Sequence, residues 1–184
     1  MNRSIMGVLL LWALMSGPVV GQTDAPRLRA ELAPLEFLAG LCWRGEFPDE
    51  AGFEVQCFEP IFSGVFLRHV RAVPREGGGE LRGEILYHWD AVEREIRFRY
   101  YSPLGAVEDG SVRPEGELLR FSDEIRWTEL GQARVISSSF QRISEDAYLA
   151  VSTDITDAVA IELIEIRFER ISREAADALV EGGL

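Results

Sequence analysis

The sequence lacks the positive charge that a protein binding a polyanion needs. It contains no lysine, and its 19 arginines face 31 acidic residues, which gives a formal net charge of −12. A nucleic-acid-binding protein needs a concentrated positive face to contact phosphates. We therefore expect no nucleic-acid partner.

Beyond its first residues the sequence also lacks a long hydrophobic run. Arg3 precedes an apolar stretch from Ile5 to Met15, which is followed by Ser16-Gly17-Pro18 and small residues up to Gly21. This is the pattern of a signal peptide, and the stretch is shorter than the roughly 20 residues that cross a bilayer. We expect cleavage after Gly21 and a periplasmic or secreted chain of residues 22–184 without a transmembrane segment. The alternative is an uncleaved signal that acts as an anchor.

The sequence has only two cysteines, Cys42 and Cys57, which flank a turn signal at residues 48–52. If Asp49 and Glu50 form the tip of a tight hairpin, the two cysteines lie opposite each other with Cβ atoms about 4.5 to 5.5 Å apart. A disulfide then fits the geometry, and export to an oxidising compartment favours it.

Metal-binding and catalytic motifs are missing as well. The alternative to the disulfide, a metal site that joins both cysteines to His69 and His88, lacks any Cys-x-x-Cys or His-x-x-x-His spacing. The serines at 137–139 have neither a glycine elbow nor a base at a defined spacing, and the acidic residues form no recognisable acid/base pair. We expect no metal, no cofactor and no catalytic residue, although an enzyme stays an open alternative.

Alternating apolar and polar residues predict β-strands along most of the chain. The strands are expected at residues 41–47, 53–61, 64–73, 81–90, 95–102, 106–113, 117–121, 125–129, 133–143, 147–155 and 159–170. Short helices are expected at residues 30–39 and, capped by Ser172, at residues 173–180. No linker or repeat divides residues 22–184, so we expect one domain.

The best-defined pair of strands lies on either side of a turn at residues 91–94. A hairpin centred there pairs Tyr87 with Phe98 and gives one apolar face. This face carries Ile85, Tyr87, Trp89, Ile96, Phe98 and Tyr100. The opposite face carries His88 beside Arg97, and we expect it to contact water.

A sheet of about ten antiparallel strands must split into a sandwich or close on itself, and short sequential hairpins favour closure. We therefore predict an all-β, antiparallel up-and-down barrel of about ten strands, with a short helix at each end of the chain. A barrel of this size can hold one small ligand. The alternative is a barrel filled by its own side chains, because the same aromatic residues would pack a core equally well.

The start of the predicted barrel carries Phe37, Leu38, Gly40, Trp43 and Gly45. With these residues the chain resembles the lipocalin-like secreted bacterial proteins of unknown function that share this opening with the nitrobindins, and residues 83–90 resemble their central strand. The resemblance implies a lipocalin-like barrel. Nitrobindins bind haem through a histidine near the carboxyl end, and no histidine follows His88 here, so the resemblance does not extend to haem.

The strand at residues 64–73 has two alternating faces, and its register stays open. If Arg68 points inward, its buried charge is costly unless a carboxylate pairs with it. The partner would be Glu59 or the anionic head group of a ligand, which Arg68 would then orient. The alternative is an outward-facing Arg68, at the surface or in a structural salt bridge.

These patterns favour an exported barrel that binds a small hydrophobic or amphipathic molecule in its interior. The expected ligand-binding residues are Trp43, Arg68, Tyr87, Trp89, Phe98 and Tyr100. One alternative is a structural or interaction module of the cell envelope with a filled barrel. Another is an isomerase-like enzyme acting inside the barrel, which fold analogy alone suggests.

Overall fold

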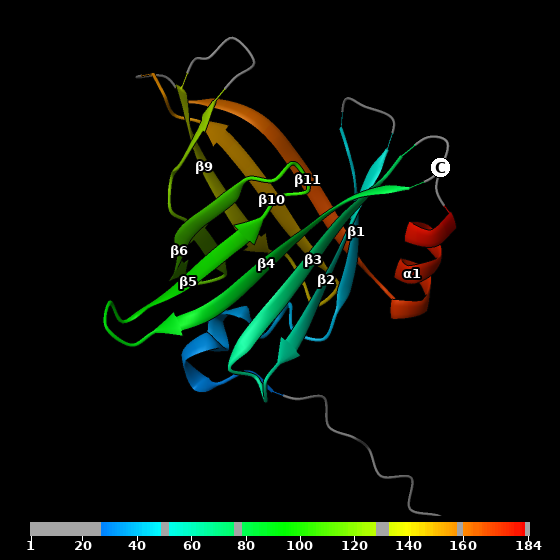
Figure 1. Cartoon of the computed structure of the whole chain (residues 1–184), viewed down its shortest axis with the longest axis horizontal. Helices are drawn as coiled ribbons and strands as arrows, with labels where there is room; N and C mark the ends of the chain where they lie inside the picture. Colours follow the sequence, from blue (N-terminus) through cyan, green and yellow to red (C-terminus); the bar gives the residue numbers. More distant parts are fainter. Residues whose placement is uncertain (1–26, 49–51, 76–78, 128–132, 158–159, 183–184) are drawn as a thin grey trace, which may run out of the picture.

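The computed structural model describes residues 27–48, 52–75, 79–127, 133–157 and 160–182 (Figure 1). The predicted signal peptide, residues 1–21, lies outside these ranges. Within them, no helix combines the length and the apolar character that crossing a membrane requires.

The described chain is built almost entirely from β-strands. The strands are β1 (Cys42–Glu46), β2 (Phe53–Ile61), β3 (Phe66–Pro74), β4 (Glu80–Asp90), β5 (Glu95–Tyr101), β6 (Val107–Glu115), β7 (Leu118–Phe121), β8 (Glu124–Trp127), β9 (Ala133–Arg142), β10 (Ala147–Asp154) and β11 (Ile161–Ile171). A 3-10 helix, η1 (Ala30–Leu35), precedes them, and an α-helix, α1 (Arg173–Gly182), follows them. Every strand overlaps a predicted one, which confirms the all-β class.

The strands form one antiparallel sheet that closes on itself. Each strand from β1 to β6 pairs with the next, β7 pairs with β9, β9 with β10, β10 with β11, and β11 with β1. The strand β8 pairs with β9 in the described residues and lies outside this ring of ten strands. The predicted closed barrel of about ten strands is therefore confirmed.

Two hairpins have the register that the sequence predicts. In the first, Cys42 lies opposite Cys57 with Cα atoms 4.1 Å apart, and a disulfide joins them. In the second, Tyr87 pairs with Phe98 and His88 with Arg97. The disulfide is thus confirmed, and it excludes the two cysteines as metal ligands.

The segment around η1 lies at one end of the barrel, as Figure 1 shows. The side chains of Leu32 and Leu35 have no exposed surface and belong to the main hydrophobic core. The backbone N–H of Arg29 donates to the carbonyl of Gly64 in the β2–β3 turn, at 3.0 Å. This end of the barrel is therefore closed by apolar side chains tied to a turn of the wall.

The segment of η1 is tighter and shorter than the helix predicted at residues 30–39. Its hydrogen bonds join residues three apart, such as Leu32 N to Arg29 O and Glu36 N to Ala33 O. Pro34 lies inside it and has no N–H to donate to an α-helical ladder. A 3-10 helix of six residues results.

The helix α1 packs on the outside of the barrel, against β1, β2 and β3 (Figure 1). Ser172 caps it as predicted, because its Oγ accepts a hydrogen bond from the N–H of Ala175 at 3.1 Å. Ala176 is buried in a small second core with Cys42 and Cys57. The helix therefore shields part of the outer face of β1 and β2 from water.

Candidate ligand-binding cavity

The interior of the barrel contains a cavity of about 200 Å³ that is partly open to solvent. Much of its lining is apolar and comes from both halves of the barrel wall. The aromatic part is Tyr87, Phe98, Tyr100, Phe121, Phe140 and Phe168, and the aliphatic part includes Ile85, Ala150, Ile164 and Ile166. Because η1 closes one end, this space lies toward the opposite end of the barrel.

The structure divides the aromatic residues expected at a binding site into two groups. Tyr87, Phe98 and Tyr100 line the cavity. Trp43 is fully buried in the core, edge-on to Tyr148 with ring centres 5.1 Å apart, and Trp89 packs against the same core. Neither tryptophan is part of the cavity lining.

Two glycines of the wall give the rings of the central hairpin their positions. A Cβ atom at Gly110 would collide with the ring of Phe98, and one at Gly83 would come within 2.7 Å of the ring of Tyr100. Each ring therefore lies flat across a glycine of the neighbouring strand. Sequence reasoning did not identify these glycines, although both lie on the inward-facing alternation of their strands.

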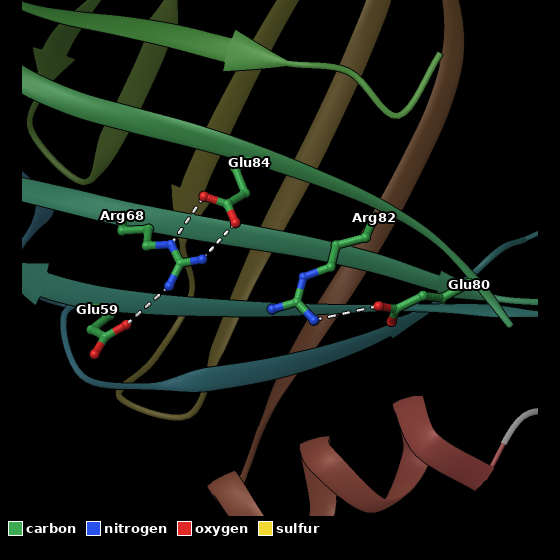
Figure 2. Close-up of polar contacts among 5 residues, drawn as sticks. All are labelled: Glu59, Arg68, Glu80, Arg82 and Glu84. Atoms are coloured by element: carbon green, nitrogen blue, oxygen red, sulfur yellow. Dashed lines mark hydrogen bonds and ion pairs between the residues drawn. The ribbon is translucent and has the colours of Figure 1, made fainter. Parts of the chain in front are cut away.

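Arg68 lies on the outer face of the barrel, not in the cavity. Figure 2 shows its guanidinium between Glu84 and Glu59. Its Nε donates to Glu84 Oε2 at 3.0 Å, its Nη1 is 3.7 Å from Glu59 Oε2, and the hydrogen bonds from Arg68 lower the pKa of Glu84. Arg68 thus takes the outward, salt-bridged position, and a ligand inside the barrel does not touch it. Arg82 and Glu80 form a further pair on the same face.

The reason is the register of β3, which turns its other face inward. Leu67 and His69 are completely buried inside, and Arg71 lines the cavity. The outward residue Ala72 is also buried, on the side of β3 against which α1 packs. Each face of β3 carries apolar residues as well as an arginine, so the alternation does not single out one apolar face that would give the orientation of the strand.

A polar cluster that sequence reasoning missed lies in the cavity wall. Arg71 donates two hydrogen bonds to Glu54, from Nε at 2.5 Å and from Nη2 at 3.1 Å. Gln56 Nε2 donates to Glu54 Oε1 at 3.0 Å, and the hydroxyl of Tyr148 donates to Gln56 Oε1 at 2.6 Å. The cluster is a closed network in which each charge has a partner.

The groups of this cluster set one another's protonation states. Burial alone would favour a neutral Arg71, but the carboxylate of Glu54 raises the pKa of Arg71 above its ordinary value. Burial, and then the charge of Glu54, raise the pKa of Tyr148 well above its ordinary value. At neutral pH the cluster therefore holds one ion pair and a neutral phenol.

His69 lies next to this cluster and is completely buried. Its ring stacks on Phe58 with centroids 4.0 Å apart, and its Nδ1 lies 3.3 Å from the hydroxyl of Tyr87. Its Nε2 is buried without a hydrogen-bond partner in the described part of the chain. Burial, and then the positive charge of Arg71, lower the pKa of His69 well below its ordinary value, so the imidazole is neutral.

The described residues contain no group of three or more histidine, cysteine or acidic side chains that could hold a metal ion. His88 lies on the outer face of the hairpin, opposite Arg97 in the register, as predicted. His69 and His88 are thus on opposite faces of the wall and do not form a common site.

Comparison with known proteins assigns no family. The chain matches no family model, and no curated protein matches it either. The cavity and the side chains around it are therefore the observations that bear on function.

Proposed function

We propose that this protein binds one small, mainly apolar molecule inside its barrel. The observation that carries the proposal is the cavity of about 200 Å³ with its aromatic and aliphatic wall. An apolar molecule that leaves water for such a wall gains free energy in proportion to the apolar area removed from water.

The volume of the cavity sets the size of the guest. Sites for drug-sized ligands begin at about 300 Å³, whereas an apolar cavity of about 150 Å³ already binds benzene. A cavity of about 200 Å³ therefore suits a single substituted ring or a short branched chain.

The proposal includes a lipocalin-like barrel that works in the periplasm or outside the cell. The disulfide between Cys42 and Cys57 supports this location, because such bonds persist in oxidising compartments. The apolar side chains of η1 close one end of the barrel, and this supports a binding site that is open at the other end only.

The proposal is tested by asking what the barrel retains. The purified protein is incubated with a lipid extract of cells, repurified and denatured, and released molecules are identified by mass spectrometry. We expect a near-stoichiometric small molecule from the wild type, and at least about tenfold less from Ala150→Phe, whose new ring occupies the cavity.

Leu149→Phe is the matched control. Leu149 precedes Ala150 on β10, so its side chain points to the opposite face of the wall, and retention should equal that of the wild type. If the wild type retains nothing and a fluorescent hydrophobic probe also stays in water, the proposal fails. A filled barrel that serves as an envelope module would then be the better account.

A further inference from the structure

We propose that the guest carries an uncharged hydroxyl group, which forms a hydrogen bond with Nε2 of His69. This inference rests on the proposed function, since it names the chemical class of the molecule inside the barrel. It depends on the geometry around His69 and on the charges of the cavity wall.

The first observation is a polar atom that the described protein leaves unsatisfied. His69 is completely buried and lines the cavity, and its Nε2 has no hydrogen-bond partner among the described residues. Buried polar atoms are nearly always hydrogen-bonded, because an unmade bond costs the full desolvation of the group. A partner that enters the cavity would remove this cost.

The second observation is that the ring of His69 is held in place before any guest arrives. Phe58 stacks on the ring at 4.0 Å and 21°, and Phe140 lies edge-on at 6.5 Å. The hydroxyl of Tyr87 is next to Nδ1. The ring, and Nε2 with it, is therefore held in one orientation, which lowers the entropy cost of forming a bond to this nitrogen.

The chemistry of a neutral imidazole points to a hydroxyl. Burial lowers the pKa of His69, so one ring nitrogen donates a hydrogen bond and the other accepts one. The bond between Nδ1 and the hydroxyl of Tyr87 decides which nitrogen carries the proton. A hydroxyl both donates and accepts, so it matches Nε2 in either form.

The charges of the wall argue for an uncharged guest. The guanidinium of Arg71 already donates two hydrogen bonds to Glu54, and the lining holds a second carboxylate, Glu108. An anion would have to enter beside these carboxylates, and a charge taken from water without a partner is strongly disfavoured. A neutral alcohol or phenol with an apolar body meets neither penalty.

Three probes with the same methyl-substituted ring test the inference. They are 4-methylphenol, 1,4-dimethylbenzene and 4-methylbenzoate, whose second substituents are a hydroxyl, a methyl and a carboxylate. Affinities are measured by calorimetry at pH 7.5, where the phenol is uncharged. Because the dimethyl compound is the more apolar, the measured quantity is the ratio of the phenol affinity to the dimethylbenzene affinity.

We expect this ratio to fall about tenfold in His69→Leu, because this variant loses the free-energy contribution of one buried hydrogen bond. His69→Gln keeps a polar side chain and should recover part of the loss. Arg68→Gln, on the outer face, should leave the ratio unchanged. The wild type should not bind 4-methylbenzoate measurably.

Other outcomes separate this inference from the proposed function. An unchanged ratio in His69→Leu, or tightest binding of 4-methylbenzoate, overturns the hydroxyl assignment and leaves apolar binding intact. Failure of the wild type to bind any of the three probes overturns the inference, and the extract experiment then decides the proposed function by itself. If His69→Leu does not fold, the ring ¹⁵N resonances of the wild type decide. Nε2 of His69 must then shift with 4-methylphenol and not with dimethylbenzene, and no shift contradicts the inference.

Discussion

His69 shows how far a barrel interior can change the behaviour of one side chain. The side chain is completely buried, and its pKa is lowered well below the ordinary value. A histidine that folding keeps neutral binds its proton more readily in the unfolded chain. The folded state therefore loses stability as the pH falls through the unfolded pKa of about 6.5.

The first prediction follows from this linkage. Between pH 7.5 and pH 5.5 the free energy of unfolding of the wild type should fall by about 1 kcal/mol because of His69. Urea denaturation at the two pH values measures it. His69→Gln should lack this part of the pH dependence, while His88→Gln, on the outer face, should retain it. Equal pH dependence in all three proteins would contradict the argument.

The ion pair of Glu54 and Arg71 is a second case in which single residues of the interior affect the stability of the fold. Glu54 is only 2% exposed, whereas Arg71 keeps 37% of its side-chain surface. Removing one partner leaves the other charge without compensation inside the wall. The cost is smaller than for a fully buried pair, because water reaches the arginine.

We predict that Glu54→Gln lowers the free energy of unfolding by about 2 kcal/mol, measured by urea denaturation. The matched control is Glu59→Gln, whose carboxylate is 54% exposed and faces Arg68 across 3.7 Å on the outer wall. Exposed pairs contribute less than about 1 kcal/mol. Equal losses in the two variants would show that the interior ion pair contributes no more to the free energy of unfolding than the exposed pair.

At the scale of elements, α1 has a protective position. The helix lies over the disulfide, with Ala176 buried against Cys42 and Cys57, while Ala178 on the same helix is exposed. A reductant in solution must reach the sulfur atoms, so local detachment of α1 controls its access.

We therefore predict that Ala176→Asp speeds reduction of the disulfide by a water-soluble phosphine on the order of fivefold, because a buried carboxylate weakens the docking of α1. Thiol labelling over time measures the rate. Ala178→Asp should reduce at the wild-type rate. If both variants reduce at the same rate as the wild type, α1 does not shield the bond.

The elements also show what could be predicted from the sequence. The β4–β5 hairpin was predictable in its register because its turn and its alternation agree, with Tyr87 and Phe98 on one face and His88 on the other. The orientation of β3 was not, because each of its two faces carries apolar residues together with an arginine, Arg68 on one face and Arg71 on the other. The interior role of His69 and Arg71 depends on that orientation and was missed with it.

For the whole molecule, the sequence predicted closure but not how the ring closes. Short hairpins indicate which consecutive strands pair, and these pairings are present. The strand structure is interrupted at Ser122 and Asp123, between β7 and β8. These two strands pair with successive parts of β9. No local pattern marks β8 as a strand outside the ring. Its position depends on the length of β9, which extends beyond β7 and pairs with β8 along the same edge.

The pairing of β1 with β11 joins the first and last strands of the described chain. A ribosome releases the amino end first, so β1 emerges long before the strand that completes the ring. Until then β1 and β10 each present an unpaired edge to which a neighbouring nascent chain could add. The ring can therefore close only after residue 171 has left the ribosome, and a chain without β11 keeps these two open sheet edges.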